Sequence, residues 1–540
     1  MVVFPGTSGI ICCMPALFVC RLPSPVACCN LPSLSDHTLQ HHFMSSLTSL
    51  PDELIKLVMH HVPLHHRLSS CCLVSRKLQA AAVAATDDLQ LQLDGQPRYI
   101  PRSDSVLGWL SEYGQQLTRV SLQLGYSSQP LLTACPNLLE LKLSKCDVQL
   151  GEADGFQGVV QVCTNLTRLE LECNLRATPE GAVIDGLSSL VHLQHLEVVP
   201  GAFSAHFANT QRYDRYIVAG LSGATLPRLQ HLTFLKVNEL STENLLQLST
   251  LTSLQELHLA TGWFGDNSDV PALALPASLN TLVLFSQAHV EARLLSFLPP
   301  GLQDLRIDGE VDGSDEGPGS FLSFVAGLQH LTRLSLQYGN IVDWPFAGPA
   351  YSALTVSSKL VVLEMYDAYF PENIWQHVFA PMQKLPHLTS LVLWGSNDCE
   401  PEAPPPWYAS DLCSIVRCCP NLCVIETNRL QPGLHVSELH KLTALTRLQL
   451  GYGRQGFDEC VRGLAAVAQL KYIEVTTRSP DITVTSLLPL TSLTALTELK
   501  SRCYWHGQYL VSLCTSTQVN MQSHLPFASD AANTAYGQYA

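Results

Sequence analysis

The sequence contains few aromatic and few charged residues. Aromatic side chains account for 7% of the 540 residues and charged side chains for 14%, so aliphatic side chains must build the interior. The chain also lacks an uninterrupted apolar run of the roughly 18 residues that a membrane-spanning helix needs. Because the mean hydropathy is +0.14, the composition argues against disorder of the whole chain. We therefore expect a folded, soluble protein.

Basic residues are outnumbered by acidic ones. The 31 lysine and arginine residues face 46 aspartate and glutamate residues, which gives a formal net charge of −15 at pH 7. A net negative chain is repelled by the phosphate backbone of nucleic acids. The charge balance, together with the missing apolar span, predicts neither a nucleic-acid nor a membrane partner.

Motifs of catalysis and of metal binding are also missing. The sequence has no GxSxG, GxxxxGK[ST] or HExxH motif, and its 19 cysteines include no CxxC pair. His60, His61, His65 and His66 lie on both sides of Pro63 without the i, i+4 spacing of a helical zinc pair. We expect a protein without enzymatic activity, cofactor or metal, in a reducing compartment. A cysteine–histidine catalytic pair, whose members meet only in space, stays open.

The ends of the chain carry no pattern of a folded domain. Residues 1–43 have no periodicity, and the apolar stretch 10–20 contains Pro15 and follows no basic residue, so it fits a secretory signal poorly. We expect an unstructured leader over 1–43, with Met44 as an alternative native start. Residues 91–116 are expected to form a linker or N-terminal cap, and the polar residues 517–540 a disordered tail.

Residues 46–90 carry a pattern of three short helices. Ser49 can cap a helix in which Pro51 occupies the first turn, and Leu54 and Val58 then lie on one face. Pro63 ends this helix, and two further helical patterns follow. Three such helices bury too little surface to be stable alone, so the module is expected to need a partner.

This segment resembles the F-box motif. The resemblance rests on the order Leu50-Pro51-Asp52-Glu53-Leu54, the apolar residues that follow, and Leu73-Val74-Ser75-Arg76-Lys77. In that family the motif binds the adaptor subunit of SCF-type ubiquitin ligases and, through it, the cullin scaffold. The resemblance assigns adaptor contacts to Leu50, Pro51, Leu54, Val58, Leu68, Leu73 and Val74. The sequence departs from the family at Leu78, where a tryptophan is common.

A repeated frame of the form Leu-x-x-Leu-x-Leu fills residues 117–500. About fifteen copies occur, the first at Leu117 and the last at Leu496, with a mean spacing of about 27 residues. The apolar residues of such a frame point inward from a short parallel strand, and the segment after each strand returns as a helix on the other side. We expect an α/β solenoid with parallel strands on the concave face and helices on the convex face.

Three of the frames are preceded by cysteine. Cys135-Pro136-Asn137-Leu138 and Cys419-Pro420-Asn421-Leu422 share one prefix, and Cys163 begins a near copy. The array thereby resembles the cysteine-containing class of leucine-rich repeats, a class often joined to F-boxes. The resemblance implies a leucine-rich-repeat solenoid behind an F-box-like module.

The strand residues that face the groove are candidates for target binding. Phe285, Asp308, Gln337, Tyr366 and Trp394 follow the frames of repeats seven to eleven. An apolar patch on a surface expected to be polar predicts a docking site, whereas an irregular frame that buries these side chains is the alternative. The predicted target-binding residues are Val283, Phe285, Gln337, Val362, Tyr366, Val392 and Trp394.

Two other groove features are open to either interpretation. Strands before residue 260 carry Glu170, Glu172, Glu197 and Glu256 beside Arg119, Lys142, Arg168, His195 and His258, which suits a partly basic peptide or a solvated face. Two longer intervals, 193–229 and 388–422, contain aromatic residues and are candidates for recognition loops or tolerated insertions.

The sequence thus predicts a non-catalytic substrate-recognition subunit of an SCF-type ubiquitin ligase, cytoplasmic, with an unidentified target protein. The alternative is a non-ligase interaction scaffold, for example in the cytoskeleton or axoneme, and a nuclear location also stays open. A small-molecule receptor on the same architecture would need a basic pocket, and the groove residues supply no cluster of lysine and arginine.

Overall fold

The structure is a computed structural model, and it describes about half of the chain. The described residues are 51, 54–55, 88–92, 114–123, 135–149, 156–176, 182–184, 186–200, 216–218, 221–234, 247–261, 275–286, 290–291, 295, 298–309, 311–312, 321–337, 348–368, 374–395, 409–430, 436–452, 457–477, 487–503 and 509–514. The chain divides into two compact units, 1–85 and 86–540, which are considered separately.

The first unit is described only at the start of the predicted F-box-like module. Leu54 and Ile55 are helical, and their N–H groups donate to the carbonyl of Pro51 at 3.0 and 3.1 Å. This is the first turn of a helix at the place where the sequence predicts one. Ile55 is fully buried, whereas Leu54 is 38% exposed. The leader, the tail and the remaining predicted adaptor contacts (Leu50, Val58, Leu68, Leu73 and Val74) lie outside the described residues.

Within the described residues, the second unit is built on one sheet of 17 strands. The pairings place the strands in chain order, all neighbours parallel except the last pair. The strands are β1 (Asp88–Gln92), β2 (Arg119–Gln123), β3 (Glu140–Gln149), β4 (Arg168–Arg176), β6 (His195–Pro200), β8 (His231–Phe234), β9 (Glu256–Thr261), β10 (Thr281–Ser286), β12 (Asp304–Asp308), β14 (Arg333–Gln337), β15 (Val362–Ala368), β16 (Ser390–Gly395), β17 (Val424–Leu430), β18 (Arg447–Tyr452), β19 (Tyr472–Thr477), β20 (Glu498–Cys503) and the antiparallel β21 (Tyr509–Cys514). Two small parallel pairs join β5 (Ala182–Ile184) to β7 (Tyr216–Val218) and β11 (Val290–Glu291) to β13 (Val311–Asp312).

Each of the fifteen frames begins just before one of the strands β2 to β20, which confirms the leucine-rich-repeat solenoid as the fold of this unit. β1 adds a strand upstream of the first frame, and Leu89 and Leu91 pair with Val120 and Leu122. The sequence pattern misses β1 because Thr86 stands where the first leucine of a frame would be.

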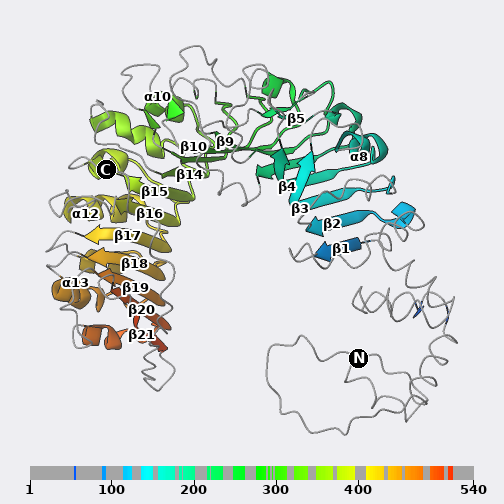
Figure 1. Cartoon of the computed structure of the whole chain (residues 1–540). Helices are drawn as coiled ribbons and strands as arrows, with labels where there is room; N and C mark the ends of the chain where they lie inside the picture. The colour runs from blue at the N-terminus through cyan, green and yellow to red at the C-terminus, as the bar shows by residue number, and fades with distance from the viewer. Residues whose placement is uncertain are drawn as a thin grey trace, which may run out of the picture. The chain divides into compact units, whose positions relative to one another are not determined.

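The outer side of the sheet carries short helices and 3-10 turns (Figure 1). The helices are α8 (Phe156–Val162), α10 (Phe321–Ala326), α11 (Ile374–Val378), α12 (Ala409–Cys418) and α13 (Phe457–Leu464). The 3-10 turns are η4 (Gly114–Gln116), η6 (Leu187–Ser189), η8 (Leu248–Thr250), η11 (Gly348–Thr355), η12 (Val436–Lys441) and η13 (Leu488–Ser492). The 3-10 segments are rich in glycine, proline, serine and threonine, which are weak helix formers, so the outer side is less helical than the sequence predicts.

Within the described residues no helix is long and apolar enough to cross a membrane.

The leucines that define the frames form the core. The first leucine of every frame, from Leu117 to Leu496, is at most 4% exposed. The second and third apolar positions are buried as well, for example Leu169 and Leu171 in β4. One continuous aliphatic column therefore connects successive repeats, as expected for a solenoid.

One carbonyl in each frame links that frame to the next. The carbonyl oxygen of Leu139, directly after the first leucine, accepts the N–H groups of Thr167 and Arg168 at 2.8 and 3.0 Å. The same pair of bonds recurs at fourteen successive carbonyls, from Thr118 to Lys471, which we call the linking carbonyls. Five threonine hydroxyls donate a third bond to a linking carbonyl: Thr167, Thr332, Thr389, Thr446 and Thr497.

The cysteines of the described repeats are mostly buried thiols. The Sγ–H of Cys163 donates to the carbonyl of Cys135 in the preceding repeat at 3.3 Å. Burial raises the pKa of the Cys163 thiol to about 12 and that of Cys135 to about 11. Cys418 and Cys419 are also fully buried and pack as small apolar residues. The raised pKa keeps the thiols of Cys135 and Cys163 protonated, so they contribute packing and not reactivity.

The frame assignment predicts a contrast between two adjacent leucines. Leu138 is fully buried as the first leucine of its frame, whereas its neighbour Leu139 is 42% exposed. We expect Leu138→Ala to lower the free energy of unfolding by about 2–5 kcal/mol and Leu139→Ala to lower it by less than about 1 kcal/mol. Urea unfolding followed by circular dichroism measures both, and equal losses would contradict the frame.

Candidate functional site

The candidate site is the face of the sheet opposite the helices. Alternate residues of each strand point to this face, and the parallel register aligns them in columns across the strands. The first column relevant here, the Asp308 column, is Phe285, Asp308, Gln337 and Tyr366. The second, the Glu364 column, is Val283, Arg306, Ser335, Glu364 and Val392.

The two columns enclose a surface hollow of about 200 Å³. It is lined by Val283, Phe285, Arg306, Ile307, Asp308, Ser335, Gln337, Glu364 and Tyr366. The hollow is smaller than the roughly 300–1,000 Å³ of ordinary small-molecule pockets. Its size suits one side chain of a partner more closely than a separate ligand.

The structure gathers only part of the predicted target-binding set at the hollow. Phe285, Gln337 and Tyr366 line it and are half-buried, while Val283 lies at its wall and is only 5% exposed. Trp394 lies beyond Tyr366, with 6.4 Å between the ring centroids.

Val392 and Val362 do not contribute to the hollow. Val392 is 4% exposed. Val362 pairs with Arg333 and Ser390, so it belongs to the column two residues earlier and not to the Glu364 column. The apolar surface on this face is therefore smaller than the sequence suggests.

Four polar residues of the hollow were absent from the predicted target-binding set: Arg306, Asp308, Ser335 and Glu364. Arg306 pairs with Asp304 at 2.7 Å in its own strand, and Arg333 pairs with Glu364 at 3.0 Å across two strands. Both arginines are thus neutralised beside the hollow. The alternation of the strand residues, applied to every frame, would have pointed to Arg306, Ser335 and Glu364.

Asp308 is the unpaired charge of the hollow. Its carboxylate forms no hydrogen bond or ion pair with any other described residue, and burial raises its pKa above the usual value. The register places it between Phe285 and Gln337. A carboxylate in this position favours a ligand that supplies positive charge.

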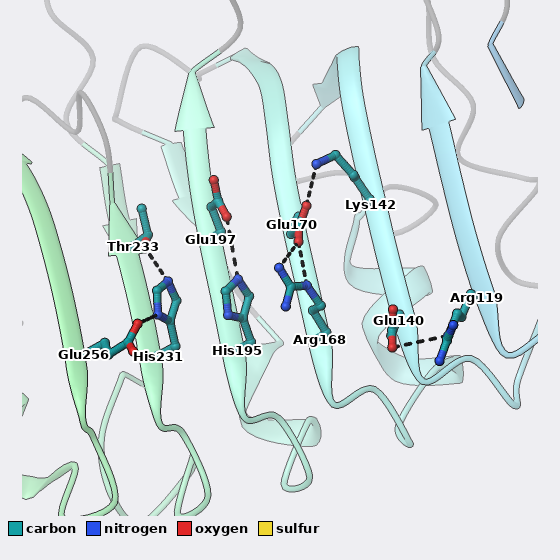
Figure 2. A network of polar contacts seen from close by, with 10 residues as sticks. All are labelled: Arg119, Glu140, Lys142, Arg168, Glu170, His195, Glu197, His231, Thr233 and Glu256. Carbon is teal, nitrogen blue, oxygen red and sulfur yellow. Dashed lines mark hydrogen bonds and ion pairs between the residues drawn. The ribbon is translucent and has the colours of Figure 1, made fainter. Parts of the chain in front are cut away.

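The strands β2 to β9 carry a different arrangement, which we call the polar ladder (Figure 2). It consists of Arg119, Glu140, Lys142, Arg168, Glu170, His195, Glu197, His231, Thr233 and Glu256. The carboxylate of Glu170 accepts from Lys142 at 2.6 Å and from Arg168 at 2.5 Å. Burial opposes ionisation of Glu170, but these two hydrogen bonds outweigh it and lower the pKa. Of the four glutamates of the acid-leaning stretch, Glu170 is therefore paired with permanent cations, and Glu256 contacts His231.

Three histidines lie side by side in the ladder region. The rings of His195 and His231 stack with centroids 4.1 Å apart, and His258 meets His231 edge to face at 5.1 Å. His231 is held by Glu256 at 2.6 Å and by Thr233 at 2.8 Å. Burial, and next the neighbouring His231, lower the pKa of His195 to about 4. The stack is therefore maintained by neutral His195.

Glu170, His195 and Glu197 place potential metal-ligand atoms within 4.8 Å of one another. His195 Nε2 lies 3.6 Å from Glu197, beyond hydrogen-bonding distance. Both Glu170 oxygens, however, already face the cations Lys142 and Arg168. A metal ion would compete with two fixed positive charges, so the cluster is assigned no metal.

Comparisons with known proteins identify no family, because neither a family model nor a curated protein matches the sequence. Among solved structures, the chain is similar to a leucine-rich-repeat protein of Leptospira interrogans, with 15% identity, a TM-score of 0.41, and coverage of 79% of this chain and 86% of that one. It is also similar to a TDR receptor, with 15% identity, a TM-score of 0.36, and coverage of 71% and 63%. The fold described above rests on the frames and the strand register.

The buried histidine predicts a pH dependence of stability. His195 has a pKa of about 4 in the folded chain against 6.5 for a free histidine, so the unfolded chain takes up the proton first as the pH falls. The free energy of unfolding should therefore decrease between about pH 6.5 and pH 4. Urea unfolding at several pH values should show a smaller decrease in His195→Gln, whereas the exposed-site control His387→Gln should keep the wild-type slope. An unchanged slope in His195→Gln would contradict this assignment.

Proposed function

We propose that the chain is a non-catalytic repeat protein that binds a target protein on the sheet face, at the hollow around Asp308. The observation that carries the proposal is a contrast along this face. The polar ladder pairs the carboxylates of Glu140 and Glu170 with arginine and lysine, whereas the hollow combines half-buried aromatic rings with an unpaired carboxylate. Partly exposed aromatic side chains in a concave site are typical anchors of protein interfaces.

A finer proposal concerns the first unit. Its resemblance to an F-box supports a role as the substrate-recognition subunit of an SCF-type ubiquitin ligase. The described turn is compatible with adaptor binding, because Ile55 packs inward while Leu54, one of the assigned contacts, stays exposed. In such a complex the chain would need no nucleophile. It would act by proximity, since holding a target beside a charged conjugating enzyme raises the effective concentration of its lysines.

The alternative is a scaffold that binds its target without recruiting a ligase. The negative net charge continues to disfavour nucleic acid as the target in either case. The two proposals share the target site and differ only in the adaptor contact, so the adaptor contact is the decisive measurement.

Co-purification with the SCF adaptor tests the finer proposal. We expect the full chain to co-purify with the adaptor. The Leu50→Ala/Pro51→Ala variant should recover about tenfold less adaptor, because the assigned contacts are apolar and central. Leu488→Ala is the matched control, since Leu488 is 55% exposed and lies in the second unit.

The double variant must first be shown to be folded by circular dichroism and by an unchanged thermal unfolding profile. Leu54→Ala provides a second variant, because Leu54 is exposed and its truncation leaves the buried Ile55 in place. Equal adaptor recovery from all variants, or no recovery from the wild type, would favour the scaffold.

A further inference from the structure

We propose that the hollow binds an arginine side chain of the target, with Asp308 as the counter-ion and Phe285 and Tyr366 as the flanking rings. This inference rests on the proposed function, because it names the chemistry of the residue that the target presents to the sheet face.

The charge balance around the hollow supports a cationic occupant. Among the described residues, the ionised side chains at and beside it are Asp304, Arg306, Asp308, Arg333 and Glu364. Arg306 is paired with Asp304, and Arg333 with Glu364. One negative charge, that of Asp308, is left without a partner among the described residues. An anionic partner would be repelled here, and a neutral one would leave a half-buried carboxylate unpaired.

The aromatic walls favour a planar cation. Phe285 pairs with Asp308 directly in register, and Tyr366 lies on the other side, one strand beyond Gln337. A guanidinium group stacks on aromatic faces and also donates two parallel hydrogen bonds to a carboxylate. The carbonyl of the Gln337 side chain can accept a further N–H. An ammonium group offers no flat surface for such stacking.

The same protein builds this arrangement with its own side chains further along the sheet face. The guanidinium carbon of Arg447 lies 4.4 Å from the centre of the Tyr472 ring, and the ammonium of Lys500 lies 5.2 Å from it. Lys500 in turn pairs with Glu498 at 2.9 Å. Ring, carboxylate and cation are thus all supplied there by the chain. At the hollow the described residues supply the rings and the carboxylate, and the cation is left to the target.

Peptide binding to the full chain tests the inference. The probe is acetyl-Gly-Arg-Gly-amide, and its neutral counterpart carries citrulline, which keeps the shape of arginine and removes the charge. Isothermal titration calorimetry should show binding of the arginine peptide at least about tenfold stronger than binding of the citrulline peptide. The difference should shrink at high salt, since the carboxylate is only partly buried.

Asp308→Asn should weaken binding of the arginine peptide by about tenfold, so that this peptide no longer binds more tightly than the citrulline peptide. Glu172→Gln is the matched control, because Glu172 follows its frame at the same repeat position as Asp308 but lies outside the hollow. Tyr366→Phe should retain binding and Tyr366→Ala should weaken it, which separates the ring from the hydroxyl group.

Several outcomes would overturn the inference. They are no detectable binding of the arginine peptide, equal binding of the citrulline peptide, tighter binding of the corresponding lysine peptide, or equal effects of Asp308→Asn and Glu172→Gln.

Adaptor recovery by Asp308→Asn is measured in parallel and should equal that of the wild type. For the wild-type chain, absence of arginine binding together with normal adaptor recovery contradicts the inference alone, whereas arginine binding without adaptor recovery contradicts the ligase proposal alone.

Discussion

The architecture of the second unit depends on the linking carbonyls. Each one accepts two backbone N–H groups of the next frame, and the series is unbroken from Thr118 to Lys471. This bond pattern permits a single register between neighbouring strands, and a slip by one residue would turn every leucine of a frame to the wrong face. The threonine hydroxyls add a third donor to five of these carbonyls. The repeats can therefore differ in length and in helix content while their strands stay aligned.

Fixed register decides the chemistry of the sheet face. Residues about one repeat apart in sequence become neighbours, so Lys142 meets Glu170 and Arg333 meets Glu364. Along β2 to β9 this pairs Glu140 and Glu170 with cations and stacks neutral His195 on His231. In the hollow, the same alignment leaves the Asp308 carboxylate without a partner among the described residues.

The frames and their burial could be predicted from the sequence because each frame is a local pattern of leucines, and local patterns need no knowledge of the neighbours. The strand β1 was not predicted, because Thr86 stands where the first leucine of a frame would be. The site was harder to predict. Phe285 and Tyr366 were found from their position after the frame, but Val362 was grouped with residues two positions away in register. Asp308 was among the residues predicted to face the groove. Its lack of a partner arises because Arg306 and Arg333 pair with other carboxylates. The spacing of residues in the sequence does not reveal these side-chain directions.

The strand β21 changes the character of one sheet edge. In the 17-stranded sheet, the strands from β1 to β20 run in the same direction, whereas β21 is antiparallel to β20 and its register shifts near Ser501. A parallel array offers the same pattern of donors and acceptors at each step, so copies of a molecule could add head to tail and form a filament. The reversed strand presents a different spacing of these groups. It therefore works against polymerisation through this edge, in the way that natural sheets protect themselves from uncontrolled assembly.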